Sequence, residues 1–131
     1  MLRFSRKMDY GLIALKYMAS QEKNRVVTAR EIAETYYLPP DLLAKIMQSL
    51  SRSGIIQSQF GSGGGYRLSK KPADVTLKEI VESIDGSLHL VGCSKSESAC
   101  ILEPHCTIKE VLLNVEKKLS SFFDTITLRD I

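Results

Sequence analysis

Three cysteines, Cys93, Cys100 and Cys106, are the residues of this 131-residue chain whose type and spacing best suit metal chemistry. Gaps of six and five residues separate them, within a loop that starts near Gly92 and is poor in apolar side chains. Thiolates are soft ligands, and three of them this close together can converge on one metal ion or one iron–sulfur cluster. The loop therefore indicates a metal or cluster site.

The rest of the composition restricts where such a site would work. No apolar run approaches the ~20 residues that a membrane-spanning helix needs, and the charged start of the chain lacks the apolar region of a signal peptide. We therefore expect a cytoplasmic protein with no membrane segment. In a reducing compartment, three cysteines are expected to be free thiols or metal ligands rather than parts of disulfides.

Charge is distributed unevenly along the chain. Residues 1–75 contain twelve Lys or Arg and six Asp or Glu, a net charge of +6, whereas residues 76–131 contain six and nine, a net charge of −3. A basic front half favours a polyanionic partner, most simply nucleic acid. The alternative interpretation is an ordinary solvated surface.

The elements that must position these groups are predicted to be mainly helical. Ser5 can cap a helix that runs to about Gln21, with apolar positions at helical spacing. Thr28 and Glu31 form a capping box that opens a short second helix. Pro40 suits the first turn of a third helix, which we expect to end near Arg52, before Gly54.

A β-hairpin is predicted to follow these helices. Residues 55–60 and 66–69 indicate two short strands, and the glycine-rich stretch 61–65 indicates the turn between them. As a phosphate-binding loop this stretch would need a following Lys-Ser/Thr and a helix, which are absent. Three helices and a hairpin predict a winged helix-turn-helix DNA-binding domain over residues 1–75.

Two further helices are predicted around the cysteines. Thr76 and Glu79 form a capping box that opens a linking helix to about Ile84, so residues 76–106 comprise this helix and the cluster-binding loop. Thr107 and Glu110 form a third capping box directly behind Cys106.

The helix that the third box opens is expected to run to about Asp124, and residues 107–131 are assigned to this helix and a C-terminal tail. Its apolar stripe is Ile108, Val111, Leu112, Val115, Leu119 and Phe122. A lone helix of this length needs its stripe buried. We expect the partner to be the same helix of a second subunit, which makes this the dimerisation helix; packing onto its own domain is the alternative.

In a winged helix, the helix after the turn enters the major groove of DNA. Lys45 can contact guanine or phosphate, and Gln48 can pair with adenine. Glycines in the wing let the backbone approach a sugar-phosphate chain. The predicted DNA-binding residues are Arg3, Ser5, Arg6, Thr28, Arg30, Asp41, Lys45, Gln48, Arg52, Gly63, Gly64, Tyr66 and Arg67. For each of them the alternative is solvated surface.

Four segments of the chain together resemble the Rrf-type winged-helix regulators, a family that includes IscR, NsrR and RirA. They are the start Leu2-Arg-x-Ser5 with Asp9-Tyr10-Gly11, the helix end Ser53-Gly54-Ile55, the wing Gly61-x-Gly-Gly-Gly65-Tyr66, and Ile126-Thr127-Leu128. The resemblance implies a homodimer that binds a double-stranded DNA operator. It also implies an iron–sulfur cluster, 4Fe-4S in preference to 2Fe-2S, held by the three cysteines near the partner's DNA-binding domain.

The fourth ligand differs between branches of this family. The IscR branch has a histidine three residues after the third cysteine, where this chain has Lys109. The NsrR branch uses an aspartate of the first helix, which matches Asp9, so the resemblance implies Asp9 of the partner subunit as the fourth ligand. His105 is the second candidate. Further candidates are Glu103, Glu97 and His89.

Two departures affect the DNA contacts. IscR has Glu-Gln in the recognition helix where this chain has Ala44-Lys45, and an arginine at the wing where this chain has Phe60. The IscR operator is therefore not expected, and a minor-groove arginine would have to come from elsewhere, with Arg67 as the candidate.

The predicted function is a repressor that senses iron–sulfur cluster status. The start of the chain most resembles regulators of the SUF assembly system, so iron–sulfur assembly genes are the first expected target. One alternative is an NsrR-like repressor that responds to nitric oxide or redox state, and another is a zinc-stabilised DNA-binding protein without sensing. An enzyme is disfavoured, because the chain shows no Ser/His/Asp constellation and no nucleotide fingerprint.

Overall fold

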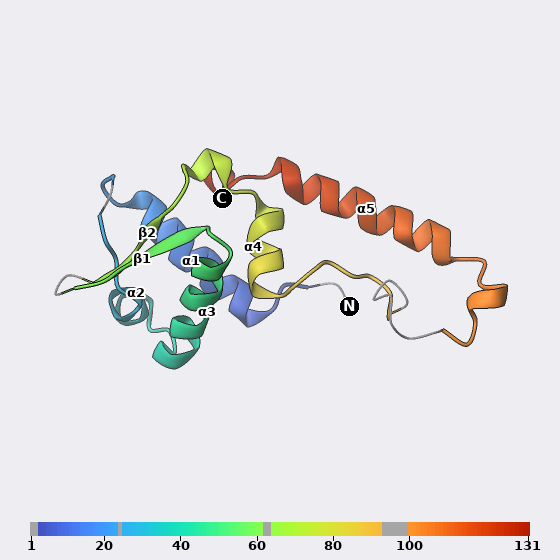
Figure 1. Ribbon diagram of the computed structural model, residues 1–131, viewed down its shortest axis with the longest axis horizontal. Coiled ribbons are helices and arrows are strands. Elements are labelled where there is room, and N and C mark those ends of the chain that lie inside the picture. The colour runs from blue at the N-terminus through green and yellow to red at the C-terminus, as the bar shows by residue number, and fades with distance from the viewer. Residues whose placement is uncertain (1–2, 24, 62–63, 93–99) are drawn as a thin grey trace.

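The computed structural model describes residues 3–23, 25–61, 64–92 and 100–131. In this part of the chain, helices predominate and two strands form one antiparallel hairpin (Figure 1). The elements are α1 (Arg6–Ser20), α2 (Ala29–Tyr36), α3 (Pro40–Arg52), β1 (Ile56–Gln59), β2 (Gly65–Leu68), α4 (Leu77–Ile84) and α5 (Lys109–Thr125). The predicted class, mainly α with a small hairpin, is confirmed.

Side-chain capping determines where several helices begin. The hydroxyl of Ser5 accepts a hydrogen bond from the backbone N–H of Met8 at 3.2 Å and so caps α1. At α4, Thr76 accepts from the N–H of Glu79, and the Glu79 carboxylate accepts from the N–H of Thr76, at 3.1 and 3.0 Å. The capping box predicted for α4 is therefore complete.

The other two predicted boxes differ from expectation. Thr28 accepts from the N–H of Glu31 at 3.0 Å, but the Glu31 carboxylate is bound chiefly by the side chains of Tyr17 and Arg25. The box at Thr107 is wrong: α5 begins at Lys109, and its N-cap residue Ile108 has no side-chain cap. Lys109 instead forms an ion pair with Glu103 at 2.5 Å, which ties the start of α5 to the turn before it.

The core lies where α1, α3 and α4 meet beneath the hairpin. Its fully buried side chains include Met8, Leu15, Leu43, Met47, Leu50, Ile56 and Ile80. Each large apolar side chain buried in this way contributes about 1.5–3 kcal/mol. Gly11 lets α4 approach α1 closely, because a Cβ atom at this position would overlap the Ile84 side chain.

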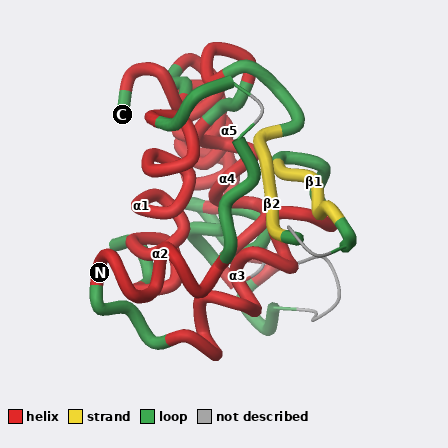
Figure 2. The backbone as a smooth tube through the Cα atoms, turned by 90° about the vertical axis from the view of Figure 1, so that its left-hand side faces the viewer, coloured by secondary structure: helices red, strands yellow, loops and turns green. Residues whose placement is uncertain are grey.

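The wing hairpin is anchored to the helical body at its base. β1 and β2 pair from Ile56 opposite Leu68 to Gln59 opposite Gly65. Val27 joins the hairpin through a single bridge, in which Val27 and Tyr66 exchange two backbone hydrogen bonds of 2.8 and 2.7 Å. Figure 2, viewed from the side of the hairpin, shows the two strands along one edge of the helices.

The C-terminal end of the chain returns to the helical core. The N–H of Leu77 donates to the carbonyl of Ile126, and the N–H of Leu128 donates to the carbonyl of Val75, both at 2.8 Å. Leu128 is buried in the core. These contacts hold the C-terminal end of α5 near α4, while its other end projects away with residues 100–108 (Figure 1). In the described ranges, no helix is both long and apolar enough to cross a membrane.

Replacement of Gly65 by alanine should destabilise the fold strongly. Gly65 has a φ of +156°, and an added Cβ atom would lie 2.7 Å from the carbonyl oxygen of Val27, which is backbone and cannot move aside. Gly54→Ala is the matched control, since Gly54 has a φ of +79° with nothing within 4 Å of the added atom. We expect Gly65→Ala to lower the unfolding free energy by about 1–3 kcal/mol more than the control, by chemical denaturation. Equal losses would contradict this packing argument.

Candidate DNA-binding surface and cysteine segment

Helices α2 and α3 form a helix-turn-helix unit. Tyr37 ends α2 in a left-handed conformation with a φ of +55°, and the N–H of Leu38 donates to the carbonyl of Ala33 at 3.0 Å. Pro39 and Pro40 then start α3. The turn directs α3 across α2 and leaves the first turns of both helices on the surface.

The outer face of α3 carries polar side chains in a row. Asp41, Lys45 and Gln48 are exposed, while the opposite face of the helix is buried in the core. An ammonium group and a side-chain amide three residues apart can together contact phosphate and base edges. The predicted orientation of this helix is therefore confirmed, although the DNA contacts themselves remain predictions.

The predicted contacts at other helix ends are also on the surface. Arg3, Arg6 and Arg52 are exposed, and so is Thr28. Arg30 pairs with Glu34 at 2.9 Å in an exposed i,i+4 ion pair, which contributes little to stability and leaves the guanidinium free to exchange its partner for a phosphate.

Ser5 has a positioning role that the sequence did not indicate. Its hydroxyl donates to Oδ1 of Asp85 at 2.6 Å while it caps α1. This hydrogen bond connects the start of α1 to the end of α4. A phosphate contact from the Ser5 side chain would have to compete with this bond.

The described strands of the wing carry Arg67 among otherwise uncharged side chains. Gly64 and Tyr66 are half-buried, and Gly63 lies outside the described residues. Nη2 of Arg67 donates to Oε1 of Gln57 at 3.3 Å, so this arginine lies across the hairpin. Phe60, at the wing, is 96% exposed.

A three-residue network joins α1 to α2. The hydroxyl of Tyr17 and the guanidinium of Arg25 both donate to Oε1 of Glu31, at 2.7 and 2.6 Å. The hydrogen bond from Tyr17, followed by the hydrogen bond and charge of Arg25, keeps the pKa of Glu31 below its usual value. The network holds the first turn of α2 in position. The sequence did not indicate it, because the spacing of Thr28 and Glu31 predicts a capping box instead.

The cysteine segment is defined as residues 93–106. Its described part, residues 100–106, forms one tight turn. Cys100 and Cys106 are free thiols, both half-buried, and a 3₁₀ helix at Glu103–His105 lies between them. The N–H of Glu103 donates to the carbonyl of Cys100 at 2.9 Å, so both cysteines belong to the same short ordered unit. Cys93 lies outside the described residues.

Two of the fourth-ligand candidates already have charged partners. Glu103 binds Lys109, whose hydrogen bond and charge lower the pKa of Glu103. Nδ1 of His89 lies 3.5 Å from the Glu116 carboxylate. His105 is exposed, Asp9 is exposed in the first turn of α1, and Glu97 lies outside the described residues. Within the described ranges, no three Cys, His, Asp or Glu side chains lie close enough together to hold a metal ion.

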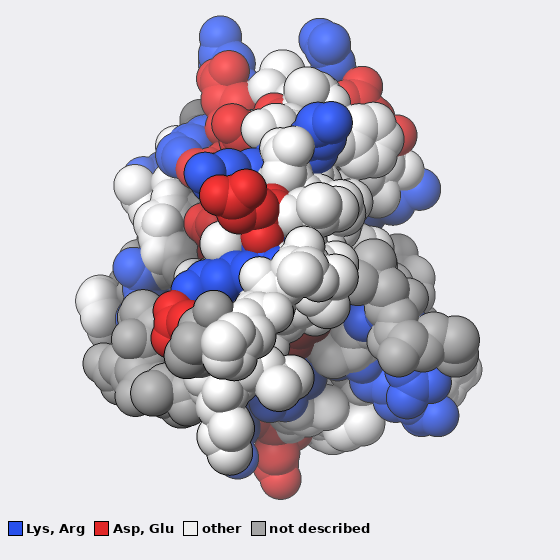
Figure 3. Space-filling view, turned by 90° about the vertical axis from the view of Figure 1, so that its right-hand side faces the viewer, with Lys and Arg blue, Asp and Glu red and all other residues white. Residues whose placement is uncertain are grey.

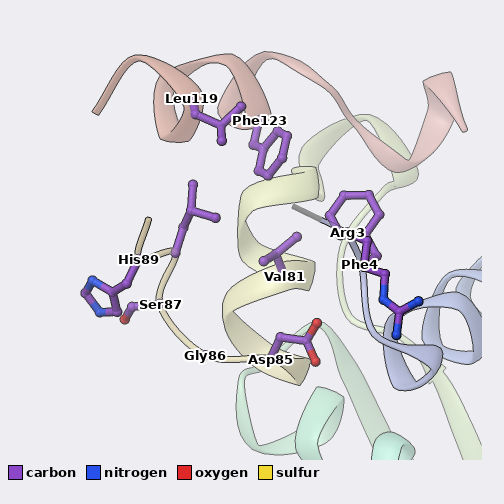
Figure 4. A pocket seen from close by; sticks show the side chains of 10 residues that line it. Arg3, Phe4, Val81, Asp85, Gly86, Ser87, His89, Leu119 and Phe123 are labelled. Carbon is purple, nitrogen blue, oxygen red and sulfur yellow. The ribbon is translucent and has the colours of Figure 1, made fainter. Parts of the chain in front are cut away.

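Helix α5 presents an apolar face to solvent. Its outer stripe, defined as Ile108, Val111, Val115 and Phe122, is 45–63% exposed. On the α4 side, Leu119 and Phe123 face Val81 across an open groove of about 570 Å³ (Figure 4). Figure 3, which faces the end of the molecule that carries the cysteine segment, shows acidic and basic side chains intermixed.

A helix-turn-helix followed by an antiparallel wing defines a winged-helix DNA-binding regulator. The chain belongs to the Rrf2 family, described as iron-dependent transcriptional regulators, because the family profile matches residues 4–131. This confirms the resemblance and the prediction that the protein is not an enzyme.

The chain matches known transcriptional regulators over most of their length. The chain is 32% identical to the HTH-type transcriptional regulator NsrR of Shouchella clausii, covering 94% of this chain and 83% of that protein. It is 31% identical to NsrR of Bacillus licheniformis, with 99% and 92% covered. Among solved structures, IscR of T. potens is 28% identical with a TM-score of 0.73, covering 98% of this chain and 85% of that one. CymR of B. subtilis, a global cysteine regulator, is 25% identical with the same TM-score, covering 99% and 95%.

The Glu31 network should make stability depend on acid pH. Because the pKa of Glu31 is lower in the folded than in the unfolded protein, its contribution is complete above the unfolded value and is lost as pH falls through the folded value. We expect Glu31→Gln to lower the unfolding free energy at pH 7 by about 1 kcal/mol, and its deficit should shrink on acidification. Glu34→Gln, which affects only an exposed pair, is the control. If Glu31→Gln lowered the unfolding free energy by the same amount at pH 3 as at pH 7, this role of the Glu31 carboxylate would be refuted.

Proposed function

We propose that the protein is a homodimeric repressor that senses an iron–sulfur cluster held by Cys93, Cys100 and Cys106. The observation that carries this proposal is the place of the cysteine segment. It joins α4, which packs on the DNA-binding domain, to α5, whose outer stripe has no cover in the described chain. Anything that holds this segment can therefore influence both the dimer and the DNA-reading helices.

The outer stripe of α5 supports the dimer. Four large apolar side chains lie along one face of a helix whose C-terminal end is anchored to the core. Burial of each contributes up to about 1.5–3 kcal/mol. The charged residues of α5 are of both signs, three basic and three acidic, and so pose no single-sign repulsion to a second copy. A two-fold pairing of α5 with the same helix covers both stripes at once.

The donor set fits a sensing cluster. Cys100 and Cys106 are free and lie on one turn, and sulfur is the preferred ligand of such clusters. When bound, the cluster supplies an iron centre that is sensitive to oxidation and to competing ligands. We propose 4Fe-4S, with 2Fe-2S as the alternative and a structural zinc ion as the outcome that would remove the sensing role.

Asp9 of the partner subunit is our proposed fourth ligand. Within one chain, α1 lies in the helical core, whereas residues 100–106 lie beyond the far end of α5 (Figure 1). Glu103 and His89 are engaged by Lys109 and Glu116. An exposed carboxylate on α1 that a dimer brings to the cysteines would complete the site.

Genes for iron–sulfur assembly are the proposed target, which would make the regulator a feedback device for cluster supply. A second candidate is a repressor that responds to nitric oxide or redox state, favoured by 31–32% identity to proteins named NsrR. A nitric oxide donor added to the loaded protein distinguishes the two. Release from DNA at stoichiometric donor favours the second candidate, whereas release only on cluster loss through iron chelation favours the first.

Mixed dimers test the shared site. Cys106→Ser and Asp9→Ala homodimers should each fail to hold a normal cluster after anaerobic reconstitution. A mixed dimer with one subunit of each kind should regain one cluster per dimer, because it contains one intact set of three cysteines facing one intact Asp9. Absorption spectra and iron content provide the measurement, with differently tagged subunits purified in two steps.

Two results would contradict this arrangement. If Asp9 acted within its own chain, the mixed dimer would have no intact site and would stay without a normal cluster. A normal cluster in the Asp9→Ala homodimer would exclude Asp9 as a ligand. Colourless wild-type protein with stoichiometric zinc would favour the structural alternative.

Lys45 should contribute directly to operator binding. We expect Lys45→Ala to weaken binding to a duplex selected by the wild-type protein from random DNA, and to reduce the salt dependence by about one phosphate contact. If Lys45 reads guanine, the loss amounts to about 1–3 kcal/mol and selectivity at one base pair relaxes. Lys117→Ala on α5 is the charge-matched control. Identical binding and salt slope in both variants would remove Lys45 from the interface.

A further inference from the structure

We propose that Ser83 and Asp85, in the last turn of α4, are the positioning residues through which the cysteine segment acts on the DNA-reading helices. This inference rests on the proposed sensing function and names the route inside each subunit. It follows from the hydrogen bonds that this turn makes to the end of α3 and the start of α1.

Ser83 forms two hydrogen bonds with the C-terminal end of the recognition helix α3. Its hydroxyl donates to the backbone carbonyl of Ser49 at 3.1 Å and accepts a hydrogen bond from the hydroxyl of Ser53 at 2.9 Å. Ser53 is the C-cap residue of α3, and its own N–H donates to the same Ser49 carbonyl at 3.1 Å. The side chain of Ser83 therefore contacts both the last turn of α3, at Ser49, and its C-cap residue, Ser53.

Asp85 holds the start of α1. Its carboxylate accepts from the hydroxyl of Ser5 at 2.6 Å and, more weakly, from the backbone N–H of Ser5 at 3.5 Å. A carboxylate beside a helix N-terminus is also favoured by the helix dipole. Asp85 is at the same time the C-cap residue of α4, and its N–H donates to the carbonyl of Val81 at 2.8 Å. A shift of this residue therefore moves the end of one helix against the start of another.

Ile84, between Ser83 and Asp85 in the sequence, fills the space between α4 and α1. It packs against Gly11 of α1 so closely that an added Cβ atom at Gly11 would overlap it. Three consecutive residues of one helical turn point in different directions around the helix axis. Their contacts on α1 and α3 therefore define both the position and the rotation of α4.

The path from this turn to the first cysteine is short. Seven residues, 86–92, separate Asp85 from Cys93. This stretch starts at Gly86, which has a φ of +86°, and runs toward α5, where the N–H of Leu90 donates to Glu116 at 2.9 Å (Figure 4). The stretch is thus held at Asp85 on one side and, through Leu90, at Glu116 on the other. A change in how Cys93 is bound is therefore transmitted to the last turn of α4.

A pair of variants with the same shape isolates the role of the Ser83 hydroxyl. Ser83→Thr keeps the hydroxyl, whereas Ser83→Val has nearly the same shape without it. For each homodimer, operator affinity is measured at fixed salt with the reconstituted cluster and after its removal by chelation. The ratio of the two affinities is the coupling, which in allosteric proteins is typically about 5- to 150-fold.

We expect the Ser83→Val protein to load its cluster with the wild-type absorption spectrum and to show a ratio close to one. Ser83→Thr should keep the wild-type ratio. Asp85→Ala, which removes the acceptor for Ser5, should also reduce the ratio, and Ser121→Val on the exposed side of α5 is the control. The ratio separates coupling from stability, because a merely structural defect lowers both affinities together.

The outcomes distinguish this inference from the proposed function. A wild-type ratio in both Ser83→Val and Asp85→Ala overturns the inference and leaves the sensing function standing. An equal loss in Ser83→Val and Ser83→Thr shows that shape, and not the hydroxyl, matters, which also overturns it. A wild-type protein without a cluster, or with one affinity in both states, overturns the proposed function and this inference with it.

Discussion

The backbone hydrogen bonds between residues 75–77 and 126–128 are the constraint on which the rest of the structure depends. They bring together two positions about fifty residues apart, and buried Leu128 adds an apolar contact that offsets the entropy of closing that loop. With its C-terminal end held there, α5 can extend in only one direction. The helix therefore leaves the body of the molecule, exposes its outer stripe and carries residues 100–108 away from the helical core.

The DNA-binding domain shows the opposite design, because each of its surface elements is held at several points. The wing is tied to Val27 through Tyr66, α2 is tied to α1 through Glu31, and α4 is tied to α1 and α3 through its last turn. Such cross-links cost little when every polar group finds a partner. They give α3 a defined orientation, which base reading in a groove requires.

A sensor needs a site that is incomplete in one molecule and a rigid route from that site to its output. In the proposed sensor the cysteine segment would meet the first condition, because Glu103 and His89 are paired with Lys109 and Glu116, and no three described ligand side chains lie close enough together to hold a metal ion. The last turn of α4 meets the second, because its contacts on two helices leave few ways for it to move alone.

Much of this arrangement was determined by the sequence itself. Ser5, Thr76, Pro40 and Gly54 act through their nearest neighbours in the chain, so the helix boundaries could be predicted from local chemistry, whereas the need for Gly65 arises from its contact with the backbone of Val27. Cysteine spacing is also local, and the thiols of Cys100 and Cys106 do lie on one short unit. Only the tertiary structure decided the rest. Glu31 binds Tyr17 and Arg25, and Lys109 pairs with Glu103. Ser5 donates a hydrogen bond to Asp85, which lies eighty positions away. A carboxylate or hydroxyl has more than one partner within reach, and which one it binds depends on helices that sequence spacing alone does not bring together.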